Sequence, residues 1–202
     1  MDFFERQLGR IYQRRFSDKC HESFFDGSGF CNFGYWTEGT TNGRQASNNL
    51  VDHLVGLLPD REGTILDVAC GHGGTTQRLT SVYKPSHITA INLFPEQLAA
   101  AKLKAPGCTF RKMDATDLEF ADNSFDAVIC VEAAHHFRTR EKFLQEAFRV
   151  LKPGRTLVLS DILLPRPPTE TPQRGSPVGK PHRSVELPST LCQCRVRDPD
   201  DQ

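Results

Sequence analysis

Polar side chains recur near the ends of short apolar runs in this chain. Each run has the length of a buried strand, and the polar residues are Asp67, Asn92, Asp114, Glu132 and Asp161. When parallel strands alternate with helices, their carboxyl ends meet at one edge of the sheet, where the ligand crevice opens. We therefore expect these five side chains to line one binding site.

A glycine-rich turn follows the first of these runs. The segment 69–74 reads Ala-Cys-Gly-His-Gly-Gly, and its glycines allow a tight turn and close approach of a ligand to the backbone. This pattern indicates a nucleotide-type cofactor, with a plain strand-to-helix connection as the alternative. A nicotinamide dinucleotide is disfavoured, because Thr76 stands where that fingerprint has its third glycine.

Apolar runs and helical patterns alternate through the body of the chain. Strands are expected at 64–69, 87–93, 108–112, 125–131 and 156–162, and helices at 42–58, 74–83, 95–105 and 138–151. This alternation favours parallel pairing with right-handed crossovers. We predict an α/β fold with a Rossmann-like doubly wound parallel sheet of order 3-2-1-4-5, preceded by N-terminal helices.

The overall composition excludes several classes of partner. The 202 residues include 25 Lys+Arg and 25 Asp+Glu, so the formal net charge is zero, and no broad positive field attracts nucleic acid or anionic lipid. No apolar run reaches the roughly 18 residues of a membrane span. The seven scattered cysteines suit reduced thiols. We predict a cytoplasmic protein without a metal site, a nucleic-acid partner or stable membrane insertion.

Four motifs, in order along residues 65–161, resemble those of class I S-adenosylmethionine-dependent methyltransferases. The motifs are 65–73, 113–126, 130–137 and 148–154. The resemblance is nearest to the branch with ubiquinone/menaquinone, tocopherol and natural-product methyltransferases. It implies S-adenosylmethionine as cofactor, S-adenosylhomocysteine as product, and methyl transfer to oxygen or carbon of a small lipophilic or glycosylated acceptor.

The resemblance also implies residues that bind the cofactor. Gly71 and Gly73, with Asp67 beneath them, would surround its methionine part. Asn92 stands where the family usually has an acidic residue for the ribose, as in a subgroup whose pattern continues with Gln97 and Ala101. An amide can accept from one hydroxyl and donate to the other, but it lacks the charge-assisted bond of a carboxylate.

The remaining cofactor contacts are expected from other strand ends and from a glycine-punctuated aromatic loop at 24–36. Asp114 and the backbone of Ala115 would bind adenine, and Tyr35 of the loop would close over the methionine end. Glu132 and His136 complete the expected cofactor site.

A pair of residues in this pattern resembles the catalytic arrangement of small-molecule O-methyltransferases. An acceptor hydroxyl must lose a proton, and histidine is a suitable base near neutral pH. We expect His135 to be this base and Asp161, at the end of the neighbouring strand, to orient it. The alternative is that His135 is only a packed histidine.

The composition changes after Leu164, and eight of the thirteen prolines lie in residues 165–202. We expect three regions: N-terminal helices and a cofactor-covering loop at 1–60, the methyltransferase core at 61–164, and a disordered Pro/Arg-rich tail at 165–202. The family's last strands are expected to be missing. The exposed edge of the fifth strand would then need a dimer or a partner chain, and a catalytically impaired cofactor-binding remnant is the alternative function.

Overall fold

A single sheet organises the protein. The structure, a computed structural model, describes residues 23–162 and 190–195, and its strand order is β3-β2-β1-β4-β5-β6. The strands are β1 (Ile65–Val68), β2 (Ile88–Asn92), β3 (Thr109–Lys112), β4 (Phe125–Val131), β5 (Leu151–Asp161) and β6 (Thr190–Arg195). Strands β1 to β5 are parallel, which confirms the predicted order 3-2-1-4-5.

Four helices connect or flank these strands. They are α3 (Gly43–Gly56), α4 (Gly74–Leu79), α5 (Pro95–Lys104) and α6 (Arg140–Val150), with short 3-10 turns η1 (Pro85–His87) and η2 (Ala134–His136). Side chains cap two of them: Asn42 accepts from the N–H of Gln45, and Thr139 accepts from the N–H of Lys142. None of the helices in the described ranges could cross a membrane.

Helix α4 ends four residues before the predicted position. The hydroxyl of Thr80 donates to the carbonyl of Gln77, and the hydroxyl of Ser81 donates to the carbonyl of Arg78. Such bonds compete with continued helix, because they occupy the carbonyl groups that the next turn would use.

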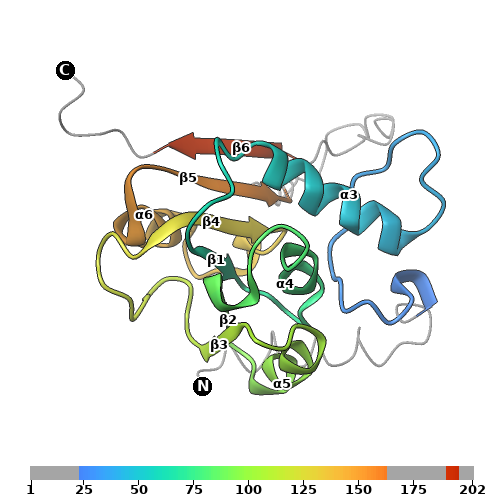
Figure 1. Cartoon of the computed structure of the whole chain (residues 1–202), viewed down its shortest axis with the longest axis horizontal. Helices are drawn as coiled ribbons and strands as arrows, with labels where there is room; N and C mark the ends of the chain where they lie inside the picture. The colour runs from blue at the N-terminus through green and yellow to red at the C-terminus, as the bar shows by residue number, and fades with distance from the viewer. Residues whose placement is uncertain (1–22, 163–189, 196–202) are drawn as a thin grey trace, which may run out of the picture.

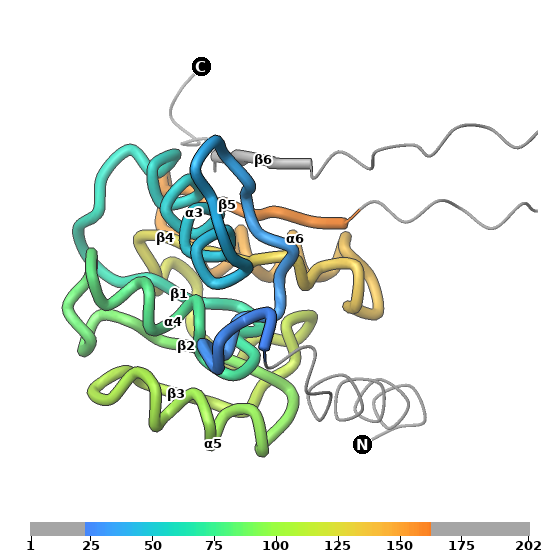
Figure 2. Tube along the Cα trace, turned by 90° about the vertical axis from the view of Figure 1, so that its right-hand side faces the viewer, coloured from blue at the N-terminus to red at the C-terminus, as the bar shows by residue number. Residues whose placement is uncertain are grey.

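The helices cover both faces of the sheet. Successive strand residues point to opposite faces, so Ile65 packs in the core cluster beneath α3, whereas its neighbour Leu66 packs with Phe143 of α6. Figure 2 shows α3 and α4 on one side of the strands and α6 on the other. The result is a three-layer domain whose carboxyl strand edge remains available for a site.

Strand β6 corrects the expectation for the tail. Residues 190–195 pair antiparallel with Thr156–Asp161 of β5, and Figure 1 shows β6 alongside β5 at the sheet edge opposite β3. The prediction relied on the average composition of the last 38 residues and so overlooked residues 190–195, which contain no proline. The backbone N–H and C=O groups of such a segment can pair with those at the edge of a sheet. The edge that was expected to need a partner chain is therefore covered by this chain. The rest of the tail and residues 1–22 lie outside the described residues.

Candidate functional site

The glycine turn after β1 has backbone conformations that favour glycine at two positions. Gly71 and Gly73 have φ angles of 54° and 88°, in the left-handed region that glycine tolerates. A Cβ atom on Gly73 would lie 2.7 Å from the Cα of Ala101 in α5. The positive φ angles confirm the predicted tight turn, and glycine at 73 with a small residue at 101 also lets the turn pack directly against α5, which the sequence did not predict.

The aromatic loop lies directly against this turn. A Cβ on Gly29 would lie 2.8 Å from the carbonyl oxygen of His72, and one on Gly74 would lie 2.8 Å from the backbone nitrogen of Phe30. Figure 1 shows residues 23–42, in blue, beyond the ends toward which β4 and β5 point. The loop therefore forms one wall of any site at the carboxyl edge.

Asp67 is buried beneath the turn. Its side chain is 1% exposed, and its Oδ2 accepts a hydrogen bond of 2.6 Å from the hydroxyl of Thr76. Burial raises the pKa of Asp67 to about 7, although the bond from Thr76 acts to lower it. Asp67 therefore changes its charge near neutral pH.

Asn92 and Gln97 form a buried amide pair. The Nδ2 of Asn92, at the end of β2, donates to the Oε1 of Gln97 in the first turn of α5 at 2.5 Å. With the amides in this orientation, the pair retains the Asn92 carbonyl as an acceptor and the Gln97 amide as a donor. Such a set matches the two hydroxyl groups of a ribose.

Asp114 stabilises the turn that follows β3. Its Oδ1 accepts bonds of 2.8 Å from both the backbone N–H and the hydroxyl of Thr116, an arrangement typical of an Asx turn. Ala115 between them is buried. The turn therefore holds the backbone of Ala115 in one conformation.

His135 and Asp161 are in contact, as the sequence predicted. The Nδ1 of His135 lies 3.1 Å from the Oδ1 of Asp161, and the backbone N–H of His135 donates to the same oxygen at 3.0 Å. Both side chains are less than 10% exposed. The His136 ring lies against the His135 ring, with a centroid distance of 3.7 Å. The carboxylate thus determines the orientation of the imidazole.

Arg140 completes this cluster, and sequence reasoning overlooked it. Its Nε donates to the Oδ2 of Asp161 at 2.5 Å. Burial acts to raise the pKa of Asp161, but bonds from Arg140, the Ile162 backbone and His135, with the charge of Arg140, hold it below its ordinary value. Asp161 is therefore anionic at neutral pH. The sequence contained no signal for Arg140 except its position at the start of a helix near His135.

Two predicted cofactor residues occupy unexpected surroundings. Glu132 accepts a bond of 2.7 Å from the backbone N–H of Phe33, so it holds the aromatic loop. The ring of Tyr35 is 5.1 Å from that of His53, and its backbone N–H donates to Ala46, so the structure places Tyr35 against α3. Its predicted role over the methionine end stays a prediction.

The strand ends lie in register across the sheet. Val68 is opposite both Ile91 and Cys130, and the N–H of Glu132 donates to the carbonyl of Ser160. The predicted side chains of β1, β2, β4 and β5 therefore come from one edge. Among the described residues, no three His, Cys, Asp or Glu side chains gather as a metal site would require.

The doubly wound sheet and its glycine turn define a Rossmann-like domain of the kind that binds a nucleotide cofactor at the carboxyl ends of its strands. Residues 66–159 match the family described as methyltransferase domain. These residues therefore belong to the methyltransferase-domain family, and their fold is that of the class I S-adenosylmethionine-dependent methyltransferases.

The chain is similar to several characterised proteins. Erythromycin 3''-O-methyltransferase of Saccharopolyspora erythraea is 32% identical over 185 residues, with 88% of this chain and 60% of the relative covered. The 27-O-demethylrifamycin SV methyltransferase of Amycolatopsis mediterranei is 34% identical over 138 residues, with 65% of this chain and 50% of the relative covered. The chain thus spans 50–60% of the length of these two relatives.

A solved structure extends this comparison. The crystal structure of the cyclase SpnF is 28% identical to this chain, has a TM-score of 0.63, and is matched over 70% of this chain and 54% of its own. That neighbour is named for a different reaction, so the fold alone does not define the chemistry. The site must supply that argument.

Proposed function

We propose that the protein transfers the methyl group of S-adenosylmethionine to a hydroxyl oxygen of a small lipophilic or glycosylated acceptor. The observation that carries this proposal is the contact between His135 and Asp161 at the strand edge that also bears the glycine turn. A base beside a cofactor pocket is what O-methylation requires, because the acceptor hydroxyl must lose its proton.

The residues around the turn fit this cofactor. A Cβ atom on Gly71 would meet only the Sγ of Cys31, at 3.4 Å, so the turn leaves room for a ligand beside this residue. The Asn92–Gln97 pair offers an acceptor and a donor to the ribose hydroxyls, and the turn at Asp114 offers a carboxylate to the adenine amino group. When bound, S-adenosylmethionine supplies an activated methyl group on a sulfonium. The protein's own contribution is to orient the acceptor and to remove its proton.

His135 is the base in this proposal. When its Nδ1–H donates to Asp161, the other ring nitrogen, Nε2, is the one that accepts a proton. The anionic carboxylate also stabilises the imidazolium that forms, as in other His–Asp pairs. Arg140 supports this arrangement by keeping Asp161 ionised.

The names of the relatives support this choice of acceptor. One is named as an O-methyltransferase of erythromycin, and the other as a methyltransferase of 27-O-demethylrifamycin SV. This supports oxygen over carbon as the methylated atom.

We further propose a cytoplasmic location, because the described cysteines are free thiols and such thiols persist in reducing compartments.

A cofactor-binding protein without methyl transfer is the second candidate. It is favoured by SpnF, a neighbour with the same fold that is named as a cyclase. In that case the site would bind the cofactor without transferring its methyl group.

Calorimetry and a transfer assay together test the proposal. S-adenosylmethionine and S-adenosylhomocysteine are titrated into the full chain, and transfer of a radiolabelled methyl group is then screened over macrolide glycosides, lipophilic phenols and quinols. Binding with transfer supports the proposal, with heat-denatured protein as the control. Binding without transfer to any acceptor favours the second candidate, and absence of binding contradicts both.

A further inference from the structure

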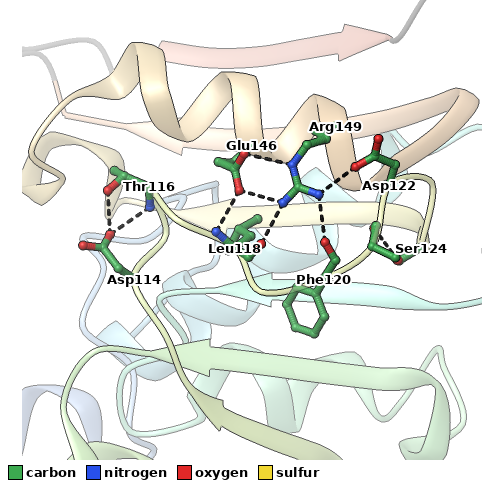
Figure 3. Close-up of polar contacts among 9 residues, drawn as sticks. Asp114, Thr116, Leu118, Phe120, Asp122, Ser124, Glu146 and Arg149 are labelled. Carbon is green, nitrogen blue, oxygen red and sulfur yellow. Dashed lines mark hydrogen bonds and ion pairs between the residues drawn. The ribbon is translucent and has the colours of Figure 1, made fainter.

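Two charged residues of α6 hold the segment that connects β3 to β4. Arg149 donates from Nη2 to the carbonyl of Leu118 at 2.7 Å, and from Nη1 to the carbonyl of Phe120 and a carboxylate oxygen of Asp122, both at 2.8 Å. Glu146 accepts from the backbone N–H of Leu118 at 2.8 Å. Figure 3 shows the two side chains reaching from the helix to this segment.

The two side chains also bind each other. Nε and Nη2 of Arg149 donate to the two carboxylate oxygens of Glu146 at 2.9 and 2.7 Å, which forms a bidentate pair. The hydrogen bond from Arg149 lowers the pKa of Glu146, and the pKa of Arg149 is raised in return. Both groups therefore stay charged over a wide pH range. We call Glu146 and Arg149 the α6 clamp.

The clamp acts on the residues next to the expected adenine site. Leu118 lies two positions after Thr116, whose N–H and hydroxyl bind Asp114. Ala115 and Leu118 also pack in one core cluster with Phe143 of α6. Because polar bonds and apolar contacts both attach this segment to α6, the position of the Asp114 turn depends on that helix.

We propose that Glu146 and Arg149 are positioning residues for adenine recognition. They fix the backbone of Leu118 and Phe120, and so hold the Asp114 turn where its carboxylate meets the adenine amino group. This inference rests on the proposed function, because it concerns the same cofactor pocket. Arg149 belongs to the 148–154 motif, to which neither the cofactor contacts nor the catalytic pair assigns a role, so the inference gives part of that motif a physical function.

Arg149→Lys is the central variant. A lysine ammonium cannot reproduce the planar fork that binds Glu146, two carbonyls and Asp122 together. Arg155→Lys is the matched control, because Arg155 has the same side-chain exposure of 31% and also pairs with two carboxylates, those of Asp60 and Asp126. Asp126 lies near the amino end of β4, whereas the candidate site lies at the carboxyl ends of the strands.

The readout is the affinity for two ligands that differ at one group. S-adenosylhomocysteine carries the 6-amino group, and S-inosylhomocysteine has a carbonyl in its place. We expect Arg149→Lys to weaken binding of the first ligand about tenfold, the size of one lost charge-assisted hydrogen bond. The affinity for S-inosylhomocysteine should fall much less, so the preference of the protein for S-adenosylhomocysteine over S-inosylhomocysteine should decrease. Arg155→Lys should leave the preference unchanged.

Glu146→Gln is the second variant and keeps an acceptor for the Leu118 N–H. It should also decrease the preference for S-adenosylhomocysteine, by a smaller factor than Arg149→Lys does. If Arg149→Lys does not fold, Glu146→Gln alone tests the inference. An unchanged preference in the folded variants, or an equal loss for both ligands, would overturn the inference while the proposed function stands. If wild-type protein binds neither ligand, the proposed function fails and the inference with it.

Discussion

The carboxylate of Glu132 accepts a hydrogen bond from the backbone N–H of Phe33, which lies 99 residues earlier in the chain. Glu132 follows β4 with a φ of 47°, a left-handed conformation that non-glycine residues rarely adopt. Phe33 belongs to the loop that packs against the glycine turn. This one bond therefore joins the end of β4 to the loop beside the glycine turn.

Removing the Glu132 carboxylate should loosen the aromatic loop. A hydrogen bond to a charged group contributes about 1.5–3 kcal/mol, so Glu132→Ala should make cleavage by chymotrypsin near residues 30–36 faster. Glu132→Gln keeps an acceptor without the charge and should give an intermediate rate. The variant Glu38→Ala, at an exposed position of the chain, is the control. Equal cleavage rates in all four proteins would contradict the role of this bond.

The pKa of Asp67 predicts how stability depends on pH. Its folded value of about 7 lies above the ordinary 3.8, so between these values the folded protein retains a proton that the unfolded chain releases. The free energy of unfolding should therefore fall as pH rises from 4 to 7, by at most roughly 4 kcal/mol from this group.

Asp67→Asn should remove most of that dependence. In urea unfolding, the variant should be more stable than wild type at pH 8, and the gap should shrink toward pH 4. Glu38→Gln, at an exposed position, should show no such change. A gap that is the same at both pH values would indicate that burial does not perturb Asp67.

Much of this site was predictable, because polar residues at the ends of parallel strands must share an edge. That logic placed His135 beside Asp161 and Asn92 near the glycine turn. Arg140 and the Glu132–Phe33 bond were not predictable. Each depends on the direction a side chain takes in the folded state, and the left-handed backbone at Glu132 has no sequence signature.

The fold shows the same limit at its C-terminal end. Strands β1, β2 and β4 are mostly apolar runs, which the sequence reveals directly, whereas β3 is Thr-Phe-Arg-Lys. Strand β6 was overlooked because Thr190–Arg195 is short and lies within proline-rich sequence. What decides its conformation is the edge of β5, a tertiary feature that composition does not contain.

His135→Ala should lower kcat and leave the affinity for S-adenosylhomocysteine nearly unchanged. A positioned base typically contributes 10²- to 10⁴-fold, so we expect a loss of about that size at saturating cofactor. His136→Ala is the neighbouring control and should affect cofactor affinity more than kcat, since that residue is predicted to line the cofactor site. A His135→Ala enzyme with wild-type kcat would contradict the base assignment.

Arg140→Gln should move the acid limb of the pH–rate profile upward. Without the guanidinium, burial dominates the environment of Asp161, and its pKa rises. The ionised Asp161 that orients His135 is then lost at a higher pH. We expect a shift of about one pH unit, measured as log kcat against pH. Arg61→Gln, at an exposed position before β1, is the control, and a profile identical to wild type in Arg140→Gln would contradict this role.

Removal of β6 should expose the edge of β5 and cause self-association. In the intact chain, Thr156–Asp161 pairs with residues 190–195 along its whole length. A chain ending at Ser189 would present these backbone groups unpaired, and exposed apolar edges pair with other chains. We expect dimers or aggregates by size-exclusion chromatography, whereas a control ending at Arg195 keeps β6 and should elute as the full chain does. If the two truncated chains elute alike, β6 does not protect this edge.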